Sequence, residues 1–405
     1  MGPVDLLFSS LPSHGHTYPL LPLAIAAREQ GHHITYATAA SFHAPLIALG
    51  FDVVDVGIDI HSAFAELAGS EVSPIEARRR DPEEVAKLAA HIFTDILPRR
   101  FFGDLQPVLA AQRFDLVVYE AATIGAAFAA KVAGVPAVCH AFGRGFDRVA
   151  AEESGTAGFA EGFVRIAEEL LGPDATDLTP DNLAGGDPYL DIYPASIQAP
   201  AYRDAPNRVP LRPVAFSEPG ELPDWVRAHA EPLIYLTLGT AFGDAGVLRT
   251  AIAGLAATGA KVLVAAGPTV QTEDLGDPPP SVTVEAWVPQ AELLPHVDLV
   301  VHHGGSGTTL GSIAAGVPQL FLPQGADQFT NADAVTGAGA ARTLRGDEVT
   351  AEAVTAAAKE LLSDADVAAR VAALAEEVAA MPSPAEVAAR LPEFVRPVHV
   401  VPAER

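Results

Sequence analysis

The chain is poor in sulfur and in basic side chains. Its 405 residues include one cysteine and two methionines, and 51 aspartates and glutamates outnumber 25 lysines and arginines. Cys139 has no partner for an internal disulfide, and its apolar neighbours predict a buried thiol in a reducing cytoplasm. The formal net charge of −26 argues against nucleic acid or an anionic membrane as the main partner. We interpret the excess acid as a solvated surface.

Long hydrophobic runs and targeting signals are also missing. No run of about 18 apolar residues predicts a transmembrane helix. The start, MGPVDLLFSSLPSHGH, lacks a basic segment followed by a long apolar core, so we expect no signal peptide. The hydrophobic content of 49% is enough to fill two domain cores in a chain of this length. We therefore expect a cytoplasmic protein of two domains.

Short apolar runs alternate with helical patterns in both halves, which is typical of parallel sheets covered by helices. In the first half we expect strands at 4–8, 33–38, 115–119 and 136–139, with helices over 20–29 and 125–133. In the second half we expect strands at 233–237, 261–265, 298–302 and 319–322, with helices over 245–257 and 306–315. Each half therefore predicts a Rossmann-like α/β domain, and the two domains should face each other.

A proline-rich stretch at 188–223 has no sustained period and predicts a linker. We accordingly place an N-terminal domain at 1–215 and a C-terminal domain at 216–382. The final segment, 383–405, should pack back on the N-terminal domain through a short helix at 383–395.

Two less regular stretches of the first half, 55–100 and 143–186, are candidate binding loops or helical lids. Aromatic residues in or beside them are candidates for contact with an apolar ligand: Phe64, Phe93 and Phe142. The ordinary alternative for each is a core residue.

The stretch VVHHGGSGTTLGSIAAGVPQLFLP at 300–323 runs from an apolar strand through a Gly/Ser/Thr turn into a helix. Backbone N–H groups at such a helix start have no partner, and the helix adds partial positive charge, so residues 304–308 predict a phosphate site. The lysine of an ATP-cleaving P-loop is absent. A diphosphate held this way suits a nucleotide-linked group that is transferred elsewhere. Glycine in this turn for packing alone is the alternative.

Three motifs occur in order along the chain: SHGHTYPLLPLA at 13–24, AWVPQAELLPHVDLVVHHGGSGTTLG at 286–311 and PQGADQFTNA at 323–332. With them the chain resembles, over nearly its whole length, the family-1 nucleotide-sugar glycosyltransferases of the GT-B fold. The likeness is strongest to the actinomycete branch that decorates antibiotics, in particular the calicheamicin-type enediyne glycosyltransferases. It implies two facing Rossmann-like domains joined by a proline-rich linker, with the acceptor bound to the first and the donor to the second.

The resemblance implies a catalytic pair. The family's general base is the histidine of GHxxP, here His16, and imidazole suits this task because its pKa lies near working pH. A turn histidine that caps a backbone group is the alternative. His14 lacks the family spacing, and we interpret it as a turn residue or pocket wall. The family's orienting aspartate is replaced by Glu120, one methylene longer; otherwise Glu120 is a solvated strand-end acid.

For the donor, the resemblance implies residues of the second half. Trp287 would stack on the nucleobase, the Val288 backbone would read the base edge, and Gln290 would reach the ribose. The remaining residues would hold the diphosphate and the sugar hydroxyls: Thr240, His303, Gly305, Ser306, Gly307 and Thr308 for the former, Asp327 and Gln328 for the latter. His302 should face the other way by strand alternation.

No metal or other cofactor is expected beside the nucleotide-sugar co-substrate. The pair His302–His303 lacks a third ligand at suitable spacing, and the acidic DAD at 364–366 lies far from the motifs. The helix dipole and neutral donors would take the place of a divalent cation.

Gly311 departs from the UDP-sugar members, in which this position commonly carries a glutamate that binds both ribose hydroxyls. Glycine cannot bind them, and a 2′-deoxyribose has no 2′-OH, so we predict a dTDP-sugar donor. Close packing of the helix is the alternative reason for glycine.

The expected activity is that of an inverting glycosyltransferase. It would move a sugar, in particular a deoxysugar, from dTDP to a hydroxyl of a hydrophobic polyketide- or enediyne-like aglycone. A UDP-sugar-dependent, macrolide-inactivating glycosyltransferase and a non-catalytic glycosyltransferase-like auxiliary protein stay open as alternatives, as does a homodimeric state. A dinucleotide oxidoreductase fits poorly, because the turn SSLPSHGH after the first strand lacks GxGxxG.

Overall fold

The computed structural model describes residues 2–68, 82–145, 159–172, 187–241 and 243–395. In this part of the chain, the first half forms a seven-stranded parallel sheet of order β3-β2-β1-β4-β5-β6-β7. Its strands are β1 (Asp5–Ser9), β2 (His33–Thr38), β3 (Asp52–Asp55), β4 (Leu116–Glu120), β5 (Ala137–His140), β6 (Tyr189–Asp191) and β7 (Arg208–Pro210).

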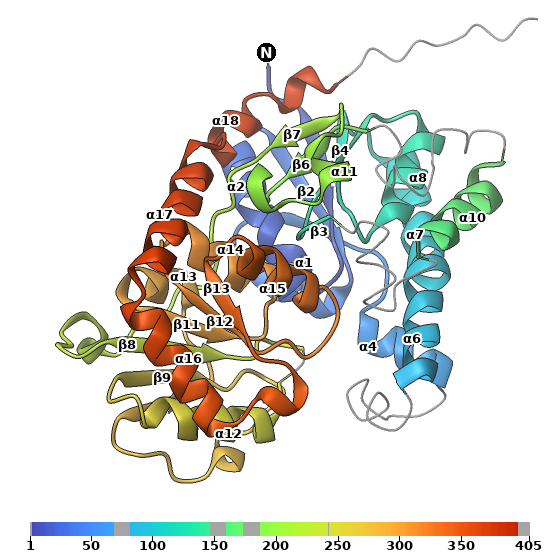
Figure 1. The fold of residues 1–405 in the computed structure, drawn as a ribbon. Coiled ribbons are helices and arrows are strands. Elements are labelled where there is room, and N and C mark those ends of the chain that lie inside the picture. Colours follow the sequence, from blue (N-terminus) through green and yellow to red (C-terminus); the bar gives the residue numbers. More distant parts are fainter. Residues whose placement is uncertain (1, 69–81, 146–158, 173–186, 242, 396–405) are drawn as a thin grey trace, which may run out of the picture.

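The second half forms a six-stranded parallel sheet of order β10-β9-β8-β11-β12-β13. Its strands are β8 (Leu233–Thr237), β9 (Lys261–Ala265), β10 (Val282–Glu285), β11 (Leu299–His302), β12 (Gln319–Phe321) and β13 (Ala341–Thr343). The predicted α/β fold of two Rossmann-like domains is confirmed, and Figure 1 shows them one above the other.

Helices cover both sheets (Figure 1). Those of the first half are α1 (His14–Thr17), α2 (Leu21–Glu29), α3 (His43–Ala48), α4 (Ile60–Ala68), α6 (Pro82–His91), α7 (Leu97–Ala111), α8 (Ile124–Ala133), α10 (Phe159–Leu171) and α11 (Pro200–Arg203). Those of the second half are α12 (Ala245–Ala256), α13 (Gln290–Leu293), α14 (Ser306–Ala314), α15 (Gln328–Gly337), α16 (Ala351–Ser363), α17 (Ala365–Ala380) and α18 (Pro384–Ala388). None of these described helices is both long and apolar enough to cross a bilayer.

The central strands form where the sequence has continuous apolar runs. Every residue of β4 (LVVYE), β8 (LIYLT) and β11 (LVVH) is buried, as expected for parallel strands covered on both faces. Helix ends carry local signals as well: α8 ends at Gly134 with a left-handed φ of 69°, and the Asp244 side chain caps α12. These signals explain why the predicted core strands and helices agree with the observed bounds to within one or two residues.

The predicted linker at 188–223 is wrong in its first part. Residues 189–191 and 208–210 form β6 and β7, which extend the N-terminal sheet at one edge. Each strand has three residues, too few to show a period, and proline is tolerated at a sheet edge. The domain boundary near residue 215 stays a prediction.

The last described α-helix, α18, lies against the N-terminal lobe. Helix α17 runs along the side of the molecule, and α18 then lies against α2 (Figure 1). The Nε2 of Gln30, the residue after α2, donates to the carbonyl of Ala385 at 2.7 Å. A capping box of Ser383 and Glu386 starts α18.

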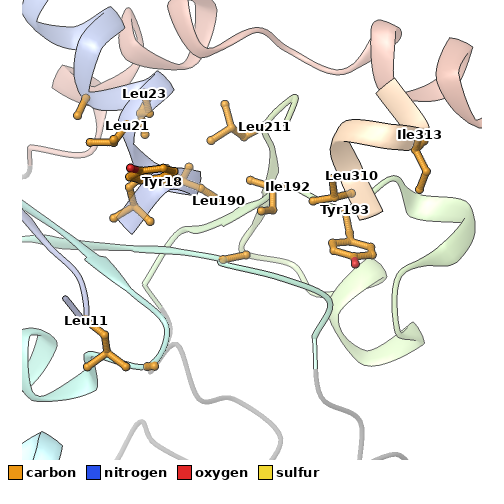
Figure 2. Packing of buried hydrophobic residues seen from close by; sticks show 14 of the residues in the cluster. Leu11, Tyr18, Leu21, Leu23, Leu190, Ile192, Tyr193, Leu211, Leu310 and Ile313 are labelled. Atoms are coloured by element: carbon orange, nitrogen blue, oxygen red, sulfur yellow. The ribbon is translucent and has the colours of Figure 1, made fainter. Parts of the chain in front are cut away.

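The two lobes share one hydrophobic cluster. Ile192 and Tyr193, which follow β6, belong to the same buried cluster as Leu310 and Ile313 of α14. Figure 2 shows Tyr193 close to Leu310. The first-half segment after β6 therefore lies against the helix that carries the predicted phosphate turn.

Candidate active site

The predicted catalytic and phosphate-binding residues lie where the carboxyl ends of the two sheets face each other. His16 follows β1 in the first half, and His303 follows β11 in the second. The lobes touch here: a Cβ built on Gly143 would lie 2.4 Å from Ser306 Oγ and 3.4 Å from Asp327 Oδ2. This is the edge at which open α/β sheets place their ligands.

Glu120 reaches His16 directly. It is the last residue of β4 and is 0% exposed, with Oε1 accepting from the Ala122 N–H at 2.7 Å. Its Oε2 lies 3.2 Å from Nδ1 of His16, an ion-pair distance. The extra methylene of glutamate therefore spans to the imidazole without a bridging group, and Nε2 is left for a ligand.

The electrostatic surroundings of His16 come from both lobes. Burial alone lowers its pKa, but Glu120 and, from the other lobe, Asp327 outweigh this and raise it. The ring of Phe142 lies 4.5 Å from that of His16, centroid to centroid. Among the three candidate aromatics, Phe142 is the one that the structure brings to the base.

His14 lies away from the base, in an aromatic wall between the lobes. Its ring packs edge-on against Tyr18 and Phe42, and lies 5.5 Å from the ring of Trp287. Burial lowers the pKa of His14, partly offset by Glu218. His14 therefore packs among aromatic residues of both lobes.

The two consecutive histidines face opposite ways, as the alternation predicts. His302 is fully buried; its Nε2 lies 2.8 Å from Gln319 Oε1, and its Nδ1 accepts from the Gly304 N–H at 3.1 Å. His302 is the last residue of β11, whereas His303 lies in the turn that follows. No group of three His, Cys, Asp or Glu side chains in the described ranges is arranged to hold a metal.

The His303 ring lies between two glycines. A Cβ on Gly239 or on Gly305 would come within 2.5 Å of the ring, so both positions need glycine for this packing. Thr240 follows Gly239 directly and is half-buried. Burial lowers the pKa of His303 to about 4, so the imidazole is neutral at working pH. It can act as a neutral hydrogen-bond donor.

The first turn of α14 has no side-chain cap. Its N-cap residue is Gly305, and Gly307 is exposed with open space where a Cβ would point. The Thr308 hydroxyl donates to Gln290 Oε1 at 3.0 Å, which joins this turn to the predicted ribose residue. Uncapped N–H groups at the positive end of a nine-residue helix are suited to a phosphate.

Asp327 joins the phosphate turn through hydrogen bonds. Its Oδ2 accepts from Ser306 Oγ at 3.0 Å and from Asn331 Nδ2 at 3.0 Å. Burial raises its pKa, and these two donors partly offset that effect. The predicted sugar acid and the predicted phosphate hydroxyl thus form one unit.

Gln328 supports the loop that carries Asp327. It is 2% exposed, and its Oε1 accepts from the N–H groups of Gln324 and Gly325. Ala326 has a φ of 53°, the one positive φ among the described non-glycine residues. Such a conformation costs free energy and persists only where its surroundings fix it.

Trp287 and Val288, the residues predicted to contact the nucleobase, differ in exposure. Trp287 is 43% exposed, whereas Val288 beside it is 4% exposed. Both border a pocket of about 370 Å³, whose other lining residues are Glu221, Leu222, Pro223, Asp224, Glu285 and Pro289. The flat face of Trp287 is therefore available for stacking.

Gly311 is buried on the same side. A Cβ there would lie 2.8 Å from Leu294 Cδ1 and 3.9 Å from Gln290 Nε2. Close packing of α14 is thus one role of this glycine. A longer side chain at 311 would also come beside Gln290, which has the nucleoside-side place predicted for it.

The other two candidate aromatics lie outside this group. Phe64 is 3% exposed and belongs to the core, and Phe93 is half-buried and stacks on Phe159 at 5.9 Å. Sequence reasoning missed Asn331 and Tyr193, which are described below. A sequence pattern points to Asn331, because it follows Asp327 by one helical turn within the third motif. No sequence pattern points to Tyr193.

Both halves of the chain match profiles of one known family. Residues 25–239 match the erythromycin biosynthesis protein CIII-like N-terminal domain, and residues 249–394 match the C-terminal domain of the same family. The L-demethylnoviosyl transferase of Streptomyces niveus is 31% identical over 396 residues, which cover 95% of this chain and 96% of that protein.

Solved structures share the fold over nearly the whole chain. CalG4, the calicheamicin glycosyltransferase, superposes with a TM-score of 0.76 at 23% identity, covering 98% of this chain and 99% of its own. The glycosyltransferase VinC in complex with dTDP gives a TM-score of 0.76 at 24% identity, with coverage of 96% and 99%.

Proposed function

Because the chain belongs to the erythromycin CIII-like family of GT-B glycosyltransferases from actinomycete antibiotic pathways, we propose that it transfers a deoxysugar from dTDP, with inversion, to an antibiotic aglycone. The acceptor would be a hydroxyl of a polyketide- or enediyne-like compound. One observation carries the proposal: Phe142, whose ring lies 4.5 Å from that of His16, adjoins Gly143, which lies against Ser306 and Asp327 of the other lobe. A sugar ring bound to Asp327 would thus lie beside the base.

In the proposed reaction, Nε2 of His16 takes the proton of the acceptor hydroxyl as its oxygen attacks the anomeric carbon. The bond from that carbon to the diphosphate oxygen breaks with the electron pair on the leaving group, so one displacement inverts the centre. Glu120 stabilises the imidazolium that forms. A base placed in this way contributes typically about 10²–10⁴ in rate.

The departing dTDP would be stabilised without a divalent cation. The uncapped start of α14 offers backbone N–H groups and partial positive charge, and neutral His303 adds a donor. Such preorganised donors act where negative charge grows in the transition state. The absence of a cofactor is part of the proposal.

Loss of the base tests the assignment. Replacing His16 with alanine should cut turnover strongly while dTDP affinity, measured by calorimetry, stays nearly intact. Turnover that survives unchanged with a hydroxyl acceptor would show that another group takes the proton. The substrates for this assay would come from a panel of dTDP-sugars and aglycones, with products read by mass spectrometry. Failure of every pair with intact dTDP binding would favour the non-catalytic auxiliary protein.

The nucleobase of the sugar donor is a more specific part of the proposal. Gly311 leaves no carboxylate beside Gln290 to bind ribose hydroxyls, and the structural relative VinC was crystallised with dTDP. Calorimetry with dTDP-glucose and UDP-glucose would compare the two donors, before and after Gly311→Glu. We expect tighter dTDP binding, and a ratio that moves toward UDP in the variant. Equal affinities with an unchanged ratio would instead favour the UDP-sugar-dependent, macrolide-inactivating alternative.

A further inference from the structure

Asn331 forms hydrogen bonds to several groups of the predicted donor pocket. It is fully buried on α15, and its Nδ2 lies within hydrogen-bond distance of three oxygens: Gly304 O at 2.9 Å, Ser306 Oγ at 3.1 Å and Asp327 Oδ2 at 3.0 Å. One amide group thus ties the phosphate turn to the sugar acid.

The other end of this amide is held from the opposite lobe. The hydroxyl of Tyr193 donates to Asn331 Oδ1 at 2.7 Å, and both side chains are 0% exposed. Burial raises the pKa of Tyr193 far above working pH, so the phenol keeps its proton. Figure 2 shows the Tyr193 ring extending past Leu310 with its oxygen at the far end. Tyr193 therefore reaches the donor lobe from the strand end of the acceptor lobe.

The Tyr193 backbone is fixed by a buried ion pair. Its N–H donates to Asp191 Oδ1 at 3.0 Å, and its carbonyl accepts from Arg208 Nη2 at 3.1 Å. Arg208 Nε also donates to Asp191 Oδ2 at 2.6 Å. The residue that crosses to Asn331 has both its backbone polar groups bonded to charged partners, and such bonds are among the stronger ones.

The Asp191 carboxylate also supports a second contact between the two lobes. Gln198 donates from Nε2 to Asp191 Oδ1 at 2.8 Å, and its Oε1 accepts from the Gly145 N–H at 3.0 Å. This bond holds the turn that contains Gly143, which lies against Ser306 and Asp327. Two contacts to the donor pocket therefore originate from one buried aspartate of the acceptor lobe.

We propose that Tyr193 is a positioning residue that acts through Asn331 to hold the phosphate turn and Asp327 in register with His16. This inference rests on the proposed function of the donor pocket. A donor held by its diphosphate and its sugar presents the anomeric carbon to the base only at one separation of the lobes. Without the phenol hydroxyl, Asn331 Oδ1 is left buried without its donor, and the lobes lose a side-chain bond.

Tyr193→Phe tests this with the loss of a single oxygen. Leaving one buried acceptor unpaired predicts a loss of about tenfold in kcat/KM for the donor, as a rise in donor KM at nearly constant acceptor KM. Tyr119→Phe is the matched control: the Tyr119 hydroxyl is bonded to Asp187 Oδ2 at 3.1 Å within the acceptor lobe. It should leave donor KM unchanged.

A second measurement needs no substrate. A fluorescence pair with one dye on each lobe, read in the ligand-free protein, should report a longer or broader distance in Tyr193→Phe than in wild type and Tyr119→Phe. Wild-type donor KM together with wild-type lobe distance in Tyr193→Phe would overturn the inference. Failure of the wild type to bind dTDP would instead overturn the proposed function and leave the distance result standing.

Asn331→Asp tests the amide nitrogen of Asn331 separately from the side-chain oxygen that accepts from Tyr193. It keeps an oxygen for Tyr193 but places a carboxylate beside Asp327 in place of the donating amide. We expect a raised donor KM with a wild-type lobe distance. This variant also replaces Tyr193→Phe if the latter does not fold, and an unchanged donor KM in it would then count against the inference.

Discussion

Glu120 Oε2 lies 3.2 Å from Nδ1 of His16, and the other oxygen of the same carboxylate is fixed by the Ala122 N–H. The contact involves Nδ1, so that Nε2 remains for the proposed acceptor, and it raises the pKa of a group whose burial alone would lower it. A buried carboxylate beside an imidazole also stabilises the charge that arises when the base takes a proton.

Glu120→Gln keeps the shape of the side chain and removes its charge. His16 must be neutral to act as a base, so activity rises as pH increases through its pKa. Because Glu120 raises that pKa, the variant should show the acidic limb of kcat/KM at lower pH. Its plateau should fall by about 10²–10⁴-fold, as for other catalytic histidines that lose their acid.

The matched control for this change is Glu120→Asp, which keeps the charge at a longer distance. Its acidic limb should stay closer to that of the wild type than the limb of the glutamine variant. An identical limb in all three proteins would mean that Glu120 has no influence on the group that titrates.

His303 offers a prediction about binding alone. Its pKa of about 4 leaves the ring neutral above that pH, so His303 should not shape the pH profile near neutrality. His303→Ala should weaken dTDP by about tenfold to a hundredfold, the value of a hydrogen bond to a charged group. Calorimetry at pH 7 measures this, and His303→Gln should recover part of the affinity. A wild-type dissociation constant in the alanine variant would place the diphosphate elsewhere.

The central part of the fold is readable from the sequence because parallel strands buried on both faces appear as short apolar runs. The runs of β4, β8 and β11 illustrate this. In contrast, β6 and β7 are three residues each and lie among prolines. Their pairing depends on the rest of the sheet, which no local pattern reveals.

Within the site, residues such as His16, His303 and Asp327 could be proposed from the sequence because they lie in motifs that resemble those of a known family. The contact between Glu120 and His16 could be anticipated from the sequence, but the distance between the two side chains could not. Tyr193 could not be anticipated, because its partner Asn331 lies 138 positions away and in the other lobe. Long-range pairs of this kind arise from the packing of whole domains.

Loss of Arg208 from the Asp191–Arg208 ion pair should destabilise the folded protein measurably. Asp191 is 0% exposed, and burial raises its pKa although Arg208 partly offsets this. Arg208→Ala leaves the buried carboxylate without its opposite charge, although Tyr193 and Gln198 still donate to it, so the free energy of unfolding should fall by about 3–5 kcal/mol in urea. Below the raised pKa the acid becomes neutral, so the deficit should shrink as pH falls.

An exposed pair provides the control for this prediction. Arg203 contacts Asp204 at 2.7 Å, but the two side chains are 43% and 63% exposed. Arg203→Ala should lower the free energy of unfolding far less than Arg208→Ala does, because water screens an exposed pair. Equal costs for Arg203→Ala and Arg208→Ala would show that the buried pair contributes no more than a surface pair.

The last described α-helix should stabilise both lobes, because α17 leads from the C-terminal lobe to α18, which packs on α2 of the N-terminal lobe. Leu391, just after α18, is 0% exposed in the shared core, and Leu391→Ala should cost about 2–5 kcal/mol of unfolding free energy. Glu393→Ala, in the same turn but exposed, should stay within about 0.5 kcal/mol of wild type. Thermal unfolding followed by calorimetry distinguishes the two variants. If both melt with the wild type, the C-terminal segment does not brace the acceptor lobe.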